Sequence, residues 1–427
     1  MKKKGRQVLL LGAGAVIDWG GPSTSELTKL IRESGFKIKN SETTITEFIY
    51  QRLIASGYLE HEVNFETIIN VIEELIVFYS EFNSKRRTPS LLKVFLKDEN
   101  INEIFNFSIK GKGRIHGYTL EIPEGVDYPY SKNSYWDENP KQFFLQHLLI
   151  LLLTNISARV SEYSYNSDER SVIDYDSMYS LTFRKWLKKS SERNIIRIYT
   201  LNYDNLFKTL MERDSLECFD GSVPFIQKDD YQAKPFDIKK IMTDDCCNVH
   251  YNLHGSSYWN VFPTDLNNHE ITSERYIHLQ YNKAPTSFQV EKGKTILVPN
   301  IITGYQKAQK SALTPFKQMQ AAFDKDCMFA NKLIIIGYSI GDEHINESIK
   351  TSLRHNPDLT IDLIAPNILD YDMYLAMRIF PYSNKGWEPQ NIIKGKVYGF
   401  SNNIYAYKMS FIEYIEFNLN KERINEY

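Results

Sequence analysis

Four short stretches of this 427-residue chain carry glycine or polar side chains that can bind or react, and each follows a segment expected to form a strand. They are Gly12-Ala13-Gly14, Thr200-Leu201-Asn202-Tyr203-Asp204, His254-Gly255 and Gly337-Tyr338-Ser339. Amide and hydroxyl groups can hold a phosphate or a ribose, and imidazole and carboxylate groups can accept a proton. For each stretch, a role in a site competes with a purely structural role.

The two glycine motifs are typical of a phosphate site. Glycine lets a strand turn sharply and approach a phosphate closely, where amides at the start of a helix point at the anion. The third glycine of the usual dinucleotide fingerprint is missing, because position 17 is Ile. A structural turn at Gly12 to Gly14 and a helix cap at Ser339 therefore stay open beside phosphate binding.

Asn202 and Asp204 directly follow an apolar run from Ile195 to Thr200. In doubly wound sheets ligands bind at the carboxyl ends of the strands, which is where these two side chains are expected. Either residue could instead cap the next helix. Because polar residues here alternate with Leu201 and Tyr203, a site role is favoured for Asn202, whereas the two roles balance for Asp204.

The stretch from Cys246 to Gly255 allows a zinc interpretation, since it holds two cysteines with His250 and His254. On a helix, histidines four residues apart could share one metal. Alternation of apolar and polar residues indicates a strand instead, which separates the two imidazoles by roughly 13 Å. We therefore expect no metal, and we interpret His254 as either a strand-end base or a hydrogen-bonded structural histidine.

These residues need a parallel sheet to bring them together. Short apolar runs at Val8 to Leu11, Ile195 to Thr200, Leu333 to Ile336 and Ile361 to Ala365 predict strands that are buried on both faces. Apolar residues at helical spacing dominate between the first two runs and predict a helical insertion over residues 40–190. Within it, residues 110–140 predict a long loop or lid, or a connector.

Composition limits the class of protein. The formal charge is −2 without long like-charged runs, so no general nucleic-acid surface is expected. The longest apolar run, around Gln146 and His147, is too short to span a membrane. Four cysteines do not form a disulfide framework, which favours a cytoplasmic protein and counts against secretion.

Taken in order, the motifs resemble those of the sirtuin family. Sirtuins open with Gly-Ala-Gly, five residues and Gly-x-Pro, continue with Thr-x-Asn-x-Asp, and then carry His-Gly and Gly-x-Ser. Here the matching residues are Gly12, Ala13, Gly14, Gly20, Pro22, Thr200, Asn202, Asp204, His254, Gly255, Gly337 and Ser339. The resemblance covers residues 8–30 and about 195–370, and it implies that Val8 to Leu11 is the first strand of a nucleotide fold and not a secretion signal.

Two departures separate the chain from the deacylase sirtuins. Those enzymes carry Asp and Arg where this chain has Ser23 and Ser25, and they carry a zinc ribbon of two Cys-x-x-Cys pairs that is missing here. The chain is more similar to the sirtuin-like effectors of bacterial anti-phage defence, which hydrolyse NAD and often read Gly-Tyr-Ser-x-x-Asp, matched through Asp342. That similarity implies a Rossmann-like domain of residues 1–39 and 191–427 around the insertion.

The resemblance also implies an activity and partners. We expect an NAD glycohydrolase without zinc, in which Asn202 holds a ribose hydroxyl or water, His254 takes a proton and Asp204 orients the groups around them. Gly12, Ala13, Gly14, Pro22, Thr200, Gly337, Ser339 and Asp342 would bind NAD. A homo-oligomer and a HerA-type ATPase partner are expected by analogy. A non-catalytic sensor of NAD or ADP-ribose and a lysine deacylase are the alternatives.

Overall fold

The structure is a computed structural model of the 427-residue chain. It describes residues 4–38, 41–78, 108–110, 118–121, 133–134, 140–167, 170–223, 226–228, 231–263, 269–276, 300–304, 307–366, 390–393, 395–401 and 403–425.

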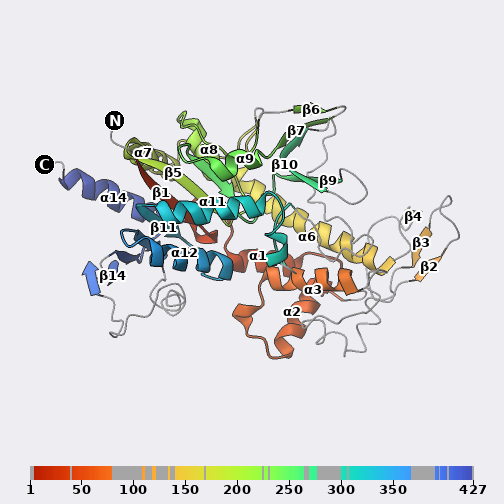
Figure 1. Ribbon diagram of the computed structural model, residues 1–427. Helices are drawn as coiled ribbons and strands as arrows, with labels where there is room; N and C mark the ends of the chain where they lie inside the picture. The colour runs from red at the N-terminus through yellow and green to blue at the C-terminus, as the bar shows by residue number, and fades with distance from the viewer. Residues whose placement is uncertain are drawn as a thin grey trace.

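An eight-stranded sheet in the order β13-β14-β15-β12-β11-β1-β5-β8 forms the centre of the fold (Figure 1). The strands from β15 to β8 run parallel, whereas β14 pairs antiparallel with β13 and β15. Their bounds are β1 (Gly5–Leu11), β5 (Asn194–Thr200), β8 (Val249–Asn252), β11 (Lys332–Ile336), β12 (Thr360–Ile364), β13 (Gln390–Ile393), β14 (Val397–Ser401) and β15 (Ile404–Tyr407). The mixed α/β class is confirmed, and β13 and β14 add an antiparallel edge to the parallel strands.

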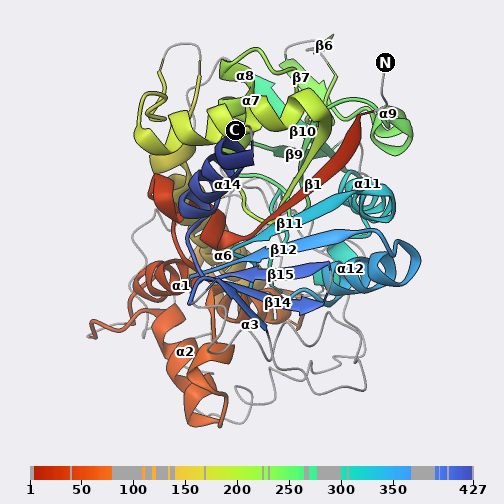
Figure 2. The ribbon, with the colours of Figure 1, turned by 90° about the vertical axis from the view of Figure 1, so that its left-hand side faces the viewer.

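Both faces of the sheet are buried, as the continuous apolar runs predict. Along β1, Leu9 and Leu11 belong to one apolar core, and Val8 and Leu10 belong to the other. The first core includes α7 (Met178–Arg193), α8 (Leu206–Arg213) and α14 (Phe411–Asn425), and the second includes α9 (Ile238–Thr243), α11 (Phe316–Phe329) and α12 (Glu343–His355). Figure 2 shows α11 and α12 on one side of the fanned strands, with α7 and α14 on the other.

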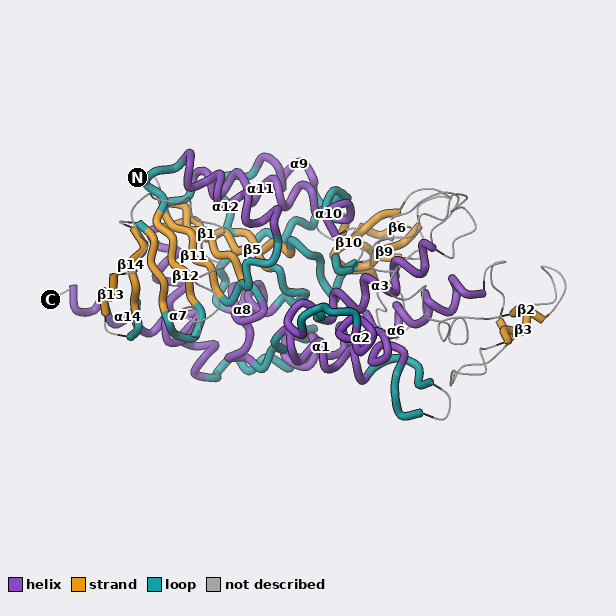
Figure 3. The backbone as a smooth tube through the Cα atoms, turned by 90° about the horizontal axis from the view of Figure 1, so that it is seen from below, coloured by secondary structure: helices purple, strands orange, loops and turns teal. Residues whose placement is uncertain are grey.

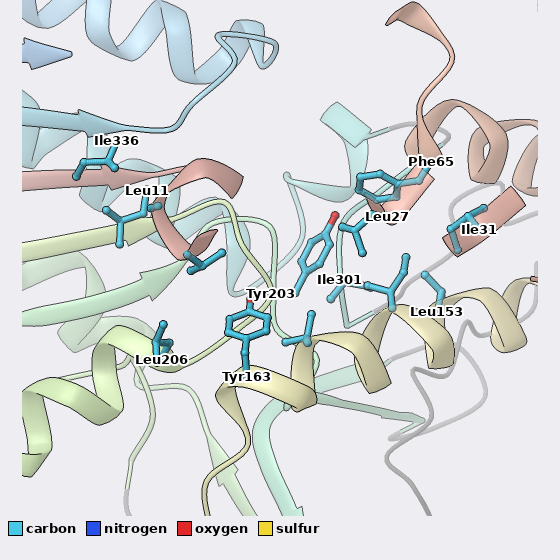
Figure 4. Packing of buried hydrophobic residues seen from close by; sticks show 14 of the residues in the cluster. Leu11, Leu27, Ile31, Phe65, Leu153, Tyr163, Tyr203, Leu206, Ile301 and Ile336 are labelled. Carbon is cyan, nitrogen blue, oxygen red and sulfur yellow. The ribbon is translucent and has the colours of Figure 1, made fainter. Parts of the chain in front are cut away.

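Helices between β1 and β5 extend the first core beyond the sheet. They are α1 (Thr24–Glu33), α2 (Ile45–Ala55), α3 (Phe65–Phe78) and α6 (Pro140–Ser164), and α3 packs along α6. Figure 4 shows side chains of α1, α3 and α6, among them Leu27, Phe65 and Leu153, packing near Tyr203 and Ile301. These helices and one face of the sheet thus share the first hydrophobic core.

Two small antiparallel sheets lie beyond the carboxyl ends of the parallel strands. One contains β6 (Ile226–Lys228), β7 (Tyr231–Pro235), β9 (Asn260–Pro263) and β10 (His269–Tyr276), and the other contains β2 (Ser108–Lys110), β3 (Tyr118–Glu121) and β4 (Asn133–Ser134). Most of the loop predicted over residues 110–140 lies outside the described residues. The exceptions are Lys110, β3, β4 and the first residue of α6. Figure 3 shows the strands of the large sheet on one side and β6, β9 and β10 on the other, with β2 and β3 farther out. Within the described ranges, no helix has the length and apolar character needed to cross a bilayer.

Candidate functional site

The loops that follow β1 and β11 touch each other through their backbones. The amide of Gly12 donates to Ile336 O at 2.9 Å, and the amide of Gly14 donates to Gly337 O at 3.1 Å. Gly337 has a φ of +56°, and a Cβ there would lie 2.3 Å from Gly14 Cα. Glycine is therefore required for this close approach. Both amides are used inside the protein, while Gly14 and Ser339 are exposed at the outer surface of the two loops.

The segment after Gly337 is held in an unfavourable backbone conformation. Ile340 has a φ of +57°, although a β-branched residue rarely adopts the left-handed region. Asn346 of α12 donates through Nδ2 to Ile340 O at 3.0 Å and accepts from Tyr338 Oη at 2.9 Å, and the Asp342 amide donates to Tyr338 Oη at 3.0 Å. Strain that is maintained by such contacts is concentrated at binding and catalytic loops.

The 3-10 helix η1 (Ala13–Trp19) leads from the glycine loop to α1. Ala13 is partly exposed beside Gly14, whereas Pro22 is buried. Ser23 accepts the amide of Glu26 at 3.2 Å, and the Glu26 carboxylate accepts the Ser23 amide at 2.7 Å. This capping box explains Ser23 at the position where the sequence departs from the deacylase pattern.

Asn202 joins the loop after β5 to the glycine loop. Its Nδ2 donates to Gly12 O at 3.0 Å, and its amide donates to the buried Thr200 Oγ1 at 3.0 Å. Asn252, at the end of β8, donates to Asn202 O at 3.2 Å and to Asp204 O at 2.8 Å. The side chain of Asn202 is partly exposed, and no group among the described residues donates to its Oδ1. That oxygen is available to a ligand.

Asp204 lies beneath this surface, 1 % exposed. Its Oδ1 accepts the amide of Leu206 at the start of α8 (2.9 Å), and its Oδ2 accepts the Tyr163 hydroxyl of α6 (2.9 Å). Burial raises the pKa of Asp204, and these hydrogen bonds oppose the rise. The carboxylate thus joins α6 to α8, and Figure 4 shows Tyr163 among the apolar side chains around this joint. The structure does not bring Asp204 into contact with His254.

His254 is brought together with Asp342. The residue is 2 % exposed, and its Nε2 has no hydrogen-bond partner among the described residues and lies 3.9 Å from Asp342 Oδ1. The ring of His344, on α12, lies 5.9 Å away between centroids. The motifs led us to expect Asp342 among the residues that bind NAD. The structure also places it beside His254.

The charges of this pair follow from their surroundings. Burial, together with the positive charge of Lys307, lowers the pKa of His254 to about 3, so the ring is neutral at pH 7. Burial opposes ionisation of Asp342, but a protonated His254 and Lys307 lower its pKa to about 2. Because His254 is neutral at pH 7, Lys307, whose Nζ lies 2.7 Å from Asp342 Oδ1, is the cation that keeps this carboxylate ionised.

Lys307 and Glu66 are residues that the motifs did not reveal. Lys307 Nζ also lies 3.1 Å from Glu66 Oε2, at the start of α3. Three residues after Lys307, Lys310 pairs with Glu73 at 2.6 Å, and both of these side chains are buried. A sequence signal did exist, because the two lysines stand one helical turn apart and the two glutamates two turns apart. Such spacing occurs on many exposed helices, so only the fold gives it meaning.

The structure does not group His250 or His254 with the cysteines of the Cys246 to Gly255 stretch. His250 is buried within β8, and neither of its ring nitrogens has a hydrogen-bond partner within the described ranges. Within the described part of the chain, the residues grouped closely enough to ligate a metal are Asp244, Cys246 and Cys247, and neither histidine belongs to that group. Asp244 is already paired with Arg197 at 2.6 Å.

Comparison with known proteins gives weak similarities only. No protein-family model and no curated protein matches the sequence. Similar solved structures include one concerned with sirtuin substrate affinity (10 % identity, TM-score 0.36, 98 % of this chain and 95 % of that chain). Others are Sir2 with a p53 peptide and NAD+ (9 %, 0.34, 99 % and 95 %) and a Sir2 homologue with NAD (11 %, 0.33, 86 % and 79 %). Similarity at this level assigns neither family nor activity, so the site is interpreted from its own residues.

Proposed function

We propose that the chain is an NAD glycohydrolase, which cleaves NAD to nicotinamide and ADP-ribose. The observation that carries the proposal is the buried, neutral His254, whose Nε2 has no partner in the described part of the chain and lies 3.9 Å from the ionised Asp342. The loop that holds His254 lies against the loop of Asn202, since the Leu253 amide donates to Thr200 O at 2.9 Å. A proton acceptor and an open amide oxygen are thus found on adjacent loops at the carboxyl ends of parallel strands.

This arrangement suits the chemistry of NAD cleavage. Nicotinamide is cationic in NAD and leaves as a neutral molecule, so no general acid is needed to break its bond to ribose. The site must support positive charge on the sugar and orient a water molecule or hydroxyl for attack. A neutral histidine can accept the proton of that nucleophile, and a neighbouring carboxylate stabilises the imidazolium that forms.

Each residue then has a role. Asn202 holds a ribose hydroxyl or the attacking water through Oδ1, His254 accepts the proton, and Asp342 stabilises the protonated ring. The pyrophosphate would lie over the exposed surface of the two glycine loops, where the Ser339 hydroxyl can donate to it, since the Gly12 and Gly14 amides already donate within the protein. Asp204 fixes the Asn202 loop from below through its contacts with α6 and α8.

In the cell, the activity would serve anti-phage defence by depleting NAD in the cytoplasm. The sirtuin-like motifs support this role, and control by a homo-oligomer or a HerA-type ATPase rests on analogy with effectors of similar build. Size-exclusion chromatography with and without the product of a neighbouring gene would test the assembly. A monomer indifferent to every candidate partner would count against it.

The activity itself is tested by nicotinamide release from NAD, with NAD affinity measured in parallel by calorimetry. Wild type, Asn202→Ala and His254→Ala are compared, alone and with the candidate partner. His250→Gln is the matched control, because His250 is as buried as His254 and lies in the same segment but outside the site. We expect release by wild type and by the control, and a loss of at least about 100-fold in the two site variants.

Other results would favour other functions. NAD binding without release under any condition would favour the non-catalytic sensor. Removal of acetyl groups from a lysine peptide, with formation of O-acetyl-ADP-ribose, would favour the deacylase. Release that persists in both site variants would show that the bond is cleaved elsewhere.

A further inference from the structure

A chain of alternating charges connects the helix α3 to His254. Glu66 Oε2 lies 3.1 Å from Lys307 Nζ, Lys307 Nζ lies 2.7 Å from Asp342 Oδ1, and Asp342 Oδ1 lies 3.9 Å from His254 Nε2. The side chains become more buried along this path, with exposed fractions of 29 % for Glu66, 21 % for Lys307, 16 % for Asp342 and 3 % for His254. In such surroundings water screens each charge weakly, so a change in one affects the next.

Lys307 is shared between two carboxylates that belong to different parts of the fold. Asp342 directly precedes α12, which packs on the eight-stranded sheet, whereas Glu66 lies on α3, between β1 and β5 in the chain. Burial lowers the pKa of Lys307, but the two carboxylates more than offset this and raise it, so the lysine stays charged. A movement of α3 would therefore change how much of this positive charge faces Asp342.

A second pair holds the lysine segment to the same helix. Lys310 Nζ lies 2.6 Å from Glu73 Oε1 and donates to Thr303 O at 2.7 Å. Glu73 stands two turns after Glu66 on α3. Two ion pairs therefore attach the segment that carries Lys307 to α3, so the position of Lys307 beside Asp342 depends on the position of this helix.

We propose that Lys307 and Glu66 are positioning residues, through which helix α3 controls the charge balance of the His254 and Asp342 pair. The inference rests on the proposed function, because His254 and Asp342 form its proton-transfer pair. With Glu66 in contact, Lys307 neutralises Asp342 only in part, and Asp342 can stabilise an imidazolium. Without Glu66, Lys307 neutralises Asp342 more fully and the imidazolium loses that support.

The two positioning residues have distinguishable effects on His254. Among the described residues, the charged and titratable groups that act on this ring are Lys307, Asp342 and His344. Removal of Lys307 leaves Asp342 unopposed, so the pKa of His254 rises. Removal of Glu66 leaves the lysine in place, so the pKa of His254 does not rise. A structural role of this contact would make both variants behave alike.

The test is an NMR titration of His254 in the full chain with 13C-labelled histidine and without NAD. Wild type is expected to show no His254 titration above about pH 4, whereas Lys307→Met shifts the pKa of His254 upward by about one unit or more. Lys307→Arg restores the wild-type curve, and Glu66→Gln shows no upward shift. Arg32→Met is the matched control, because it breaks a pair with Glu47 (2.7 Å) in the same group of helices but away from the site.

Kinetics supply the second readout. If the chain cleaves NAD, Glu66→Gln lowers kcat about tenfold at constant KM, and Lys307→Met moves the acidic limb of the kcat profile to higher pH. An upward pKa shift in both variants, or in neither, would overturn the inference. If wild type releases no nicotinamide, the proposed function fails, yet the NMR titration still decides whether Lys307 controls His254.

Discussion

The contact between the two glycine loops gives the sharpest prediction, for Gly337→Ala. Alanine at a φ of +56° costs roughly 1 kcal/mol in the left-handed region. Its Cβ would also lie 2.3 Å from Gly14 Cα and 2.5 Å from Gly14 C, both backbone atoms that cannot rotate away. The loops must separate by about 1 Å to reach ordinary contact.

That separation breaks two backbone hydrogen bonds, Gly12 N to Ile336 O and Gly14 N to Gly337 O. Each is worth about 1 kcal/mol, so Gly337→Ala lowers the free energy of unfolding by about 3 kcal/mol in total. Gly395→Ala is the control, because Gly395 has a φ of +73° with nothing within 4 Å of an added Cβ. The control loses only the conformational part, roughly 1 kcal/mol.

Urea unfolding of the two variants measures the difference, and NAD affinity shows whether the separated loops still bind. We expect Gly337→Ala to be about 2 kcal/mol less stable than Gly395→Ala and to bind NAD more weakly. Equal stability of the two variants, within about 0.5 kcal/mol, would refute the argument that backbone contact requires glycine at position 337.

Three further predictions concern buried charges. Lys310→Met removes the cation that pairs with the buried Glu73 and lowers the free energy of unfolding, measured in urea, by about 3–5 kcal/mol. Adding Glu73→Leu restores most of that free energy. Equal loss in the single and double variants would contradict the prediction. Lys208 lowers the pKa of Asp220 from 3.8 to about 2, although burial alone would raise it. Ionised Asp220 therefore contributes roughly 2 kcal/mol of stability above about pH 4, and this contribution is lost as the pH falls towards 2. Asp220→Asn should remove this acid dependence, and an unchanged pH profile would count against it. Asp204→Ala removes two hydrogen-bond acceptors and costs about 2 kcal/mol in thermal unfolding, while Asp204→Asn keeps one oxygen and costs less; the reverse order would exclude the structural role.

Local sequence patterns determined the sheet and the loops that carry the candidate site. Short β-branched runs such as Leu333 to Ile336 form strands because an apolar segment of that length can be buried on both faces. Parallel strands place the residues that follow them at one edge, so Asn202, His254 and the glycine loops could be assigned to that edge from their positions alone.

The tertiary structure decided which groups act on one another. Nothing local in the sequence indicates that Asp342 lies beside His254, or that Lys307 is shared between Asp342 and Glu66, because these contacts join segments far apart in the chain. The need for glycine at positions 12 and 337 is also a tertiary effect, because a Cβ at either position would collide with the backbone of the other loop. Charge state, too, depends on burial: the sequence supplies an imidazole at position 254, and only the packing around it makes that imidazole neutral at pH 7.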